Sequence, residues 1–140
     1  QWHHALITRN TSGVFKLYFD GIYIMDNEDI NYSYQASSSD LAGIVTSNYP
    51  LTAGIHHIGH NRSYVGNIDE IAIWNEELTA DEVTVLYNSG IGSPANLNSG
   101  NYTSADNLTG YWNFNDNQGN ILTDISGNGN NGSINGAWYS

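Results

Sequence analysis

Alternating apolar and polar positions are the main pattern along the chain, and they predict strands. Over residues 2–9 the alternation places Trp2 and Leu6 on one face, as in a strand with one side toward a core. Two further apolar runs flank Asp20-Gly21, a pair that favours the positive φ angles of a type I′ hairpin turn. The predicted strands are 2–9, 14–19, 22–25, 41–45, 54–59, 68–74, 108–115, 121–122 and 133–139.

One short helix is predicted over residues 80–88. Thr79 is a suitable N-cap, and two acidic residues follow it near the positive end of the helix dipole. Val83 and Leu86 supply an apolar stripe at helical spacing, and Gly90 ends the helix. A single helix in a chain of strands and turns is typical of a β-sandwich with a helical corner.

Two long polar segments separate these elements. Residues 26–53 are rich in Ser and predict mainly a loop over one face of the protein. Residues 90–105 hold Gly, Ser, Asn and Pro94 with few apolar positions, which predicts a linker or a long excursion. Strands and an Asn/Gly-rich turn follow, so the pattern places structured segments on both sides of the linker.

The charge is strongly one-sided. Fourteen acidic residues face three basic ones (Arg9, Lys16 and Arg62), which gives a net charge of −11. This balance argues against nucleic acid and anionic membranes as partners, because both require clustered Lys and Arg. No apolar run is long enough to cross a bilayer. The chain begins at Gln1 without a leader pattern, and we expect a processed or excised piece.

Two sets of motifs point to one family. The first set is WHHA at residues 2–5, LYFDG at 17–21 and GNIDEIAIW at 66–74; the second is GYWNF at 110–114 and DISGNGNNG at 124–132. Together they resemble the laminin-G-like (concanavalin A-like) jelly roll. The resemblance implies an all-β fold, an antiparallel β-sandwich or jelly roll, here with one short helix. In that family the second set opens the domain and the first set closes it, so the order is inverted here.

The inverted order predicts a division into residues 1–92 (the closing part of such a sandwich), a linker over 93–107, and residues 108–140 (its opening part). Two explanations remain open. The chain either carries the end of one module and the start of the next, or it is a permuted sandwich in which residues 108–140 pack back onto residues 1–90. The family's long middle portion has no counterpart in this sequence. Missing strands would leave sheet edges that pair with neighbouring chains.

Acidic and amide side chains suggest Ca²⁺ as the one candidate cofactor, because hard cations prefer oxygen ligands. Two loops offer such ligands, although ordinary turns and solvated loops have the same composition. A zinc site at the neighbouring histidines His56 and His57 is not favoured, since adjacent strand residues point to opposite faces. The candidate calcium ligands are Asp26, Asn27 and Asp29 in the first loop and Asp124, Asn128 and Asn130 in the second.

Catalysis is not predicted. Glycosidases of concanavalin A-like folds need two carboxylates that face one cleft. Asp69 and Glu70 are adjacent in a predicted strand, and we therefore expect them to point to opposite faces. The sequence also has no nucleophile elbow, no cysteine and no phosphate loop.

The sequence therefore predicts a non-catalytic binding module at the cell surface or outside the cell, for adhesion or glycan recognition. Its partner would be a glycan or a surface protein, bound by aromatic stacking and by hydrogen bonds from Asn and Asp. The alternative is a structural subunit of a surface filament, sheath or fibre that self-associates by sharing strands. The candidate ligand-binding residues are four tyrosines in or beside polar loops: Tyr32, Tyr34, Tyr49 and Tyr64.

Overall fold

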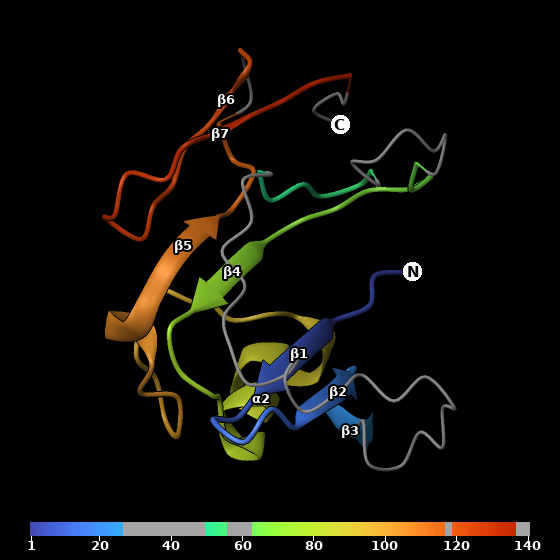
Figure 1. The fold of residues 1–140 in the computed structure, drawn as a ribbon, viewed down its shortest axis with the longest axis vertical. Coiled ribbons are helices and arrows are strands. Elements are labelled where there is room, and N and C mark those ends of the chain that lie inside the picture. Colours follow the sequence, from blue (N-terminus) through green and yellow to red (C-terminus); the bar gives the residue numbers. More distant parts are fainter. Residues whose placement is uncertain (27–49, 56–62, 117–118, 137–140) are drawn as a thin grey trace.

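The N-terminal strands form an antiparallel meander in the order β1-β2-β3 (Figure 1). The computed structural model describes residues 1–26, 50–55, 63–116 and 119–136. The three strands are β1 (Ala5–Arg9), β2 (Phe15–Phe19) and β3 (Ile22–Asp26). The predicted hairpin is confirmed, because Asp20 and Gly21 join β2 to β3 with φ angles of 51° and 75°.

Gly21 also has a packing role in this hairpin. A Cβ atom at this position would lie 2.7 Å from the ring of Tyr87, so the missing side chain lets the tyrosine lie against the turn. The turn is thereby fixed both by its backbone angles and by the helix that carries Tyr87.

A second ladder connects distant parts of the sequence. Strand β4 (Ile71–Trp74) pairs antiparallel with β5 (Leu108–Trp112), and Ala72 lies opposite Tyr111. This ladder joins the predicted segment 1–92 to the predicted segment 108–140; the boundaries of these segments stay a prediction. A small third sheet pairs β6 (Ile121–Leu122) with β7 (Gly132–Ser133).

The predicted helix is confirmed as α2 (Ala80–Tyr87). Thr79 is its N-cap, and the Glu82 carboxylate bonds back to the Thr79 backbone to complete a capping box. The helix ends at Asn88, which has a left-handed φ of 46°. Two short 3-10 helices follow, η1 (Asn88–Gly90) and η2 (Ala105–Asn107).

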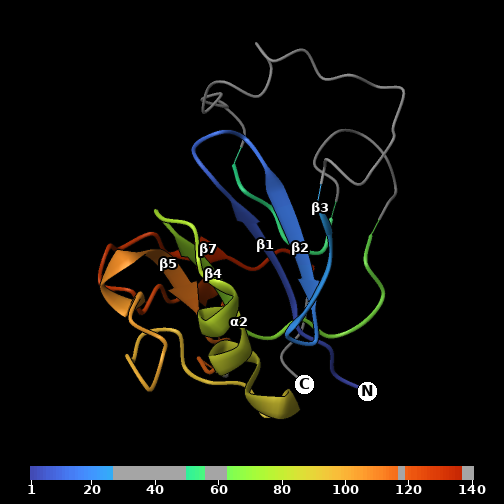
Figure 2. The ribbon, with the colours of Figure 1, turned by 90° about the horizontal axis from the view of Figure 1, so that it is seen from below.

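The core lies where α2 packs between the β1-β2-β3 meander and the β4–β5 ladder (Figure 2). Val83, Tyr102 and Tyr111 are its most deeply buried side chains. Tyr102 and the buried Ala95 belong to residues 93–107, which we expected to be a linker. The other buried apolar residues are Leu6, Tyr18, Leu78, Leu86 and Leu108.

One predicted core residue is not in the core. Trp2 was expected to face inward with Leu6, but its side chain is 60% exposed and the first strand begins only at Ala5. The alternation therefore describes residues 5–9 and does not extend to Trp2. Trp74 is half-buried and packs against the core, as expected.

Candidate functional site

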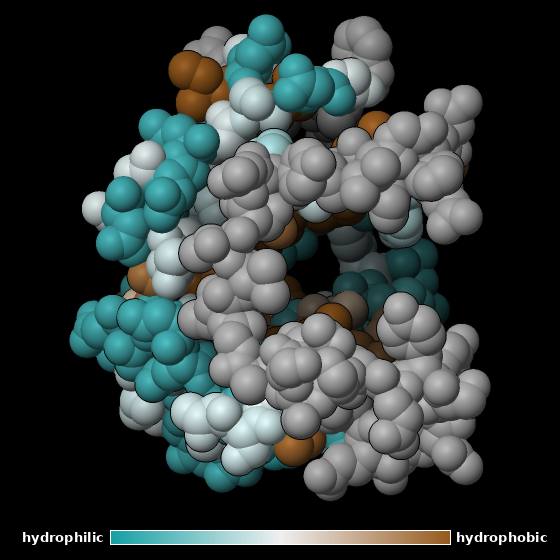
Figure 3. All heavy atoms as spheres, in the orientation of Figure 1, coloured by the Kyte–Doolittle hydropathy of each residue, from teal (hydrophilic) through white to brown (hydrophobic). Residues whose placement is uncertain are grey.

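A cavity of about 1710 Å³ lies along strands β1 and β4. One side is formed by residues 1–11 and the other by residues 66–78, with the end of α2 and residues 90–95 below them. The space-filling view shows this face of the protein hollowed at its centre, with apolar side chains inside the hollow (Figure 3). The cavity is larger than ordinary small-molecule pockets, which hold about 300–1,000 Å³, so it suits an extended ligand.

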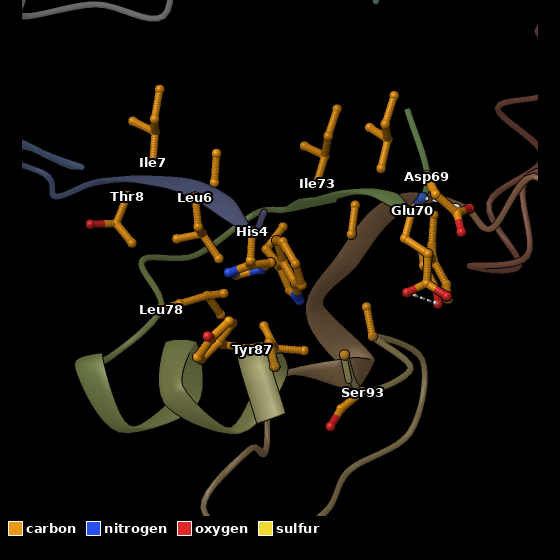
Figure 4. A pocket seen from close by; sticks show the side chains of 18 of the residues that line it. His4, Leu6, Ile7, Thr8, Asp69, Glu70, Ile73, Leu78, Tyr87 and Ser93 are labelled. Atoms are coloured by element: carbon orange, nitrogen blue, oxygen red, sulfur yellow. Dashed lines mark hydrogen bonds between the residues drawn. The ribbon is translucent and has the colours of Figure 1, made fainter. Parts of the chain in front are cut away.

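Side chains of the two strands divide between two sides of the cavity (Figure 4). Ile7 and Ile73 point away from α2. Leu6 and His4 point toward the helix, where Leu78 also lies. Apolar side chains of β1 and β4 therefore line the cavity both above and below the plane of the strands, among polar lining residues.

Carboxylates gather at the start of β4. The Tyr111 hydroxyl donates to Glu70 at 3.0 Å, and the Glu70 backbone N–H donates to Asp69 at 3.0 Å. Burial, followed by the nearby Glu70 charge, raises the pKa of the Tyr111 hydroxyl. Asp69 and Glu70 were expected to lie in a strand, but β4 begins only at Ile71 and Glu70 has a left-handed φ of 56°. Strand alternation does not apply to them.

Asp20 joins the hairpin turn to the segment before β1. It accepts the His4 backbone N–H at 2.9 Å and contacts the His3 ring at 2.8 Å. The hydrogen bond from the His4 backbone holds the pKa of Asp20 below its usual range. Burial lowers the pKa of His4, and the Asp20 charge only partly opposes this shift. Asp20 therefore fixes one end of the cavity's β1 side.

Two buried polar atoms beside the cavity, the Nδ1 of His4 and the Oγ1 of Thr8, have no hydrogen-bond partner among the residues that the structure describes. Both residues line the cavity, and Thr8 is only 4% exposed. Buried polar groups in proteins are nearly always paired, so each unpaired one needs an explanation. Both side chains point toward α2, so the unpaired atoms belong to the packing between β1 and the helix.

Exposed aromatic side chains lie at the rim of the cavity. Trp2 and Tyr64 are each 60% exposed, and both line the cavity. Gly66 makes room for Tyr64, because a Cβ atom there would lie 2.8 Å from the tyrosine hydroxyl. The ring of Tyr64 is thus held over the backbone and presented to solvent.

The second predicted calcium loop folds around one carboxylate. Asp124 is buried and accepts backbone N–H groups from Tyr111 at 2.9 Å, Ser126 at 2.9 Å and Asn130 at 2.8 Å. Burial alone would raise the pKa of Asp124, but these N–H groups outweigh it and hold the pKa at about 2. The side chains of Asn128 and Asn130 donate to the backbone carbonyls of Leu108 and Thr109, at 2.7 and 2.8 Å.

The structure brings together some of the predicted site residues. Tyr64 lines the cavity, and Asp124, Asn128 and Asn130 share one loop. Asp26 ends β3 and accepts the Tyr23 hydroxyl at 3.0 Å. Within the described ranges no group of three or more His, Cys, Asp or Glu side chains is arranged to hold a metal ion. Five predicted residues lie outside those ranges: Asn27, Asp29, Tyr32, Tyr34 and Tyr49.

Sequence reasoning missed most of the cavity. Trp2 was assigned to a strand facing the core, and only its exposure reveals another role. The cavity leaves no local sequence signal, because its two sides are formed by β1 and β4, which are distant in sequence. Among the helices that the structure describes, none is long and apolar enough to span a membrane.

Comparisons with known proteins identify the family of this chain. A family model described as the concanavalin A-like lectin/glucanases superfamily matches residues 1–84. Among solved structures, the chain is similar to an S-layer domain-containing protein (residues 221–444) from Clostridium thermocellum ATCC 27405, with 21% identity and a TM-score of 0.39. That match covers 62% of this chain and 39% of the other, so this chain spans well under half of its length. No curated protein matches the chain.

Proposed function

Because the chain belongs to the concanavalin A-like lectin/glucanase superfamily, we propose that it is a non-catalytic module that binds glycans or glycan-bearing surface partners outside the cell. The observation that carries the proposal is the aromatic rim of the cavity, Trp2 and Tyr64. Exposed aromatic rings stack on the apolar faces of sugars, and the neighbouring Asn67 and Asp69 offer hydrogen bonds to hydroxyl groups. An extracellular location accords with this role.

The distribution of carboxylates argues for binding without catalysis. The cavity is lined by Asp69, Glu70, Glu76 and Glu77, all from the β4 side, while residues 1–11 on the β1 side contain no acidic residue. Glycoside hydrolysis needs carboxylates on either side of the scissile bond. In the described part of the chain the cavity offers them from one side only.

We expect Tyr64→Ala to weaken glycan binding by about tenfold, since the stacking of one ring contributes roughly 1–1.5 kcal/mol. A glycan array identifies the ligand, and titration calorimetry on the purified chain measures the affinity. Tyr64→Phe is the matched control, because it keeps the ring and removes only the hydroxyl. Equal affinities for all three proteins, or an array without any binding, would contradict the proposed role of the rim.

Calcium assistance stays a prediction, now with a structural distinction between the two loops. Asp124 already accepts three backbone N–H groups, so an ion there would displace donors. Asp26 ends β3 and accepts the Tyr23 hydroxyl, and the other two candidate ligands of its loop, Asn27 and Asp29, lie outside the described residues. A bound ion would stabilise the folded state in proportion to its affinity.

The filament alternative and the calcium prediction are tested together by the mass of the chain in solution. We expect light scattering to give a monomer in both CaCl₂ and EDTA, and the melting temperature to rise in CaCl₂. Oligomers that grow with protein concentration would favour the structural subunit over the binding module. An unchanged melting temperature at about 10 mM CaCl₂, which exceeds the dissociation constants of roughly 0.1–1 mM of extracellular calcium modules, would remove calcium from the proposal.

A further inference from the structure

The edges of β1 and β4 that face the cavity carry unpaired backbone groups. In the β1–β2 ladder the Asp20 N–H donates to the His4 carbonyl, and antiparallel pairing alternates residue by residue. The backbone groups of Ala5 and Ile7 therefore point away from β2, toward the cavity. Neither residue has a backbone partner on that side among the residues that the structure describes.

The same reasoning applies to β4. The N–H of Tyr111 donates to Asp124 and its carbonyl accepts from Ile125, so the Tyr111 backbone points away from β4. By alternation, the backbone groups of the opposite residue Ala72 point away from β5 and toward the cavity. Ala5 and Ile7 on one side and Ala72 on the other thus offer backbone donors and acceptors to the cavity, without partners among the residues that the structure describes.

The two strands also run in the same direction. The arrows of β1 and β4 point the same way in Figure 1, and in Figure 4 both His4 to Thr8 and Asp69 to Ile73 run from right to left. One strand placed between them would be antiparallel to both. It would join the β1-β2-β3 meander and the β4–β5 ladder into a single antiparallel sheet.

An inserted strand also covers exposed apolar side chains. Ile7, which is 67% exposed, and Ile73 would be covered from the side away from α2.

The acidic residues on the β4 side of the cavity indicate which kind of segment binds there. Acidic residues lie at both ends of the β4 side, with Asp69 and Glu70 before the strand and Glu76 and Glu77 after it. Glu77 has an ion pair with Lys16 at 3.2 Å, whereas no basic side chain in the described ranges is paired with Asp69 or Glu70. The whole chain has only three basic residues, far apart in sequence, so a second copy has no strand with several positive charges to offer.

We propose that the cavity between β1 and β4 accepts one extended segment of a different polypeptide, about five residues long and antiparallel to both strands. Its central residues are apolar, because they lie among Leu6, Ile7 and Ile73. Lys or Arg follows them, opposite Asp69 and Glu70, which have no basic partner in the described ranges. Recognition by strand addition goes beyond the proposed glycan binding and shares its cavity and Asp69 with it.

The test uses three blocked, fluorophore-labelled peptides and the complete 140-residue chain. The probe is KKVIVTKK, its charge-reversed control is EEVIVTEE, and KKVIPTKK has a central proline that removes a backbone donor. We expect fluorescence anisotropy to show saturable binding of the probe, with about tenfold weaker binding of each control peptide. Equal binding of the probe and the charge-reversed peptide, or no binding of the probe at millimolar concentration, would overturn the proposal.

Protein variants locate the binding. Ala5→Pro removes a donor that faces the cavity but no bond to β2, and proline is tolerated at the first residue of an edge strand. We expect it to weaken probe binding about tenfold, while Ala5→Val, which keeps the N–H, binds normally. Circular dichroism checks that both variants are folded, and Asp69→Asn should weaken binding more at low salt than at high salt.

Two outcomes separate this proposal from the others. Binding of the probe without any glycan binding would support strand addition and reject only the proposed function. If the chain forms concentration-dependent oligomers and the Ala5→Pro variant abolishes them, a second copy fills the cavity. This outcome would contradict the proposal that the occupant is a different polypeptide.

Discussion

Asp124→Asn is expected to lower the free energy of unfolding by about 2–3 kcal/mol, because a buried charged acceptor of several hydrogen bonds is lost. The carboxylate of Asp124 accepts backbone N–H groups from Tyr111, Ser126 and Asn130. An amide in its place has only one oxygen, so its NH₂ group would face at least one of these donors. The loop would then lose its contact with β5. Urea denaturation followed by tryptophan fluorescence measures the change.

A pH series tests the same interaction independently. The pKa of Asp124 is about 2 in the folded protein and 3.8 in its ordinary state, so its stabilising effect is present above pH 4 and is lost as the pH falls toward 2. Asp20 and Glu82 also have lowered pKa values and add to this acid sensitivity. We expect the Asp124→Asn variant to lose stability less steeply than the wild type between these pH values.

Asp106→Asn is the matched control for both experiments. It removes the same charge from the exposed 3-10 helix η2, and changes at such surface positions usually stay within about 0.5 kcal/mol. If the two variants had equal stability and equal pH profiles, the hydrogen bonds from the three backbone N–H groups to Asp124 would not stabilise the loop.

Glu82→Ala is expected to lower the free energy of unfolding by roughly 3 kcal/mol, because it leaves several donors without an acceptor. The buried carboxylate accepts the Thr79 backbone N–H at 2.9 Å, the Thr79 hydroxyl at 3.0 Å and the Ser104 hydroxyl. Burial of the carboxylate would raise its pKa, but the hydrogen bonds from Ser104 and Thr79 lower it below the usual range. Glu82 therefore caps the helix and ties it to residues 103–104. Thermal and urea unfolding both measure the loss.

The control for Glu82 is Asp81→Ala in the same helical turn. Asp81 is exposed and acts only through the helix dipole, so we expect a loss of about 0.3–1 kcal/mol. Amide hydrogen exchange adds a local measurement, since the Glu82→Ala variant should expose the amides around Tyr102 to exchange while Asp81→Ala leaves them protected. Similar losses in the two variants would reduce the role of Glu82 to ordinary capping.

Local chemistry explains which parts of the fold are predictable from sequence. The Asp20-Gly21 turn, the Thr79 cap and the end of α2 each depend on residues within a few positions, and all are predicted correctly. The fold class is also predicted correctly, through motifs that resemble the family whose model matches residues 1–84. What these predictions share is that each needs only one short stretch of sequence.

The predictions that fail depend on exact strand limits or on distant partners. Asp69 and Glu70 were assigned to a strand that begins only at Ile71, so strand alternation does not apply to them. The buried Tyr102 lies in a polar segment, and its place in the core depends on Trp74, whose indole donates to its hydroxyl at 2.9 Å from 28 residues away. No local pattern contains such a contact, and the same holds for the cavity between β1 and β4.

Because basic residues are scarce in this chain, trypsin is a selective probe of the pairing between β1 and β2. Trypsin cleaves only after Lys or Arg, and two of the three such sites in this chain, Arg9 and Lys16, lie inside the paired strands β1 and β2. Cleavage there requires the hairpin to open first, because a protease binds its substrate as an extended, unpaired segment. The rate of tryptic cleavage at these two positions is thus a direct readout of how often β1 separates from β2.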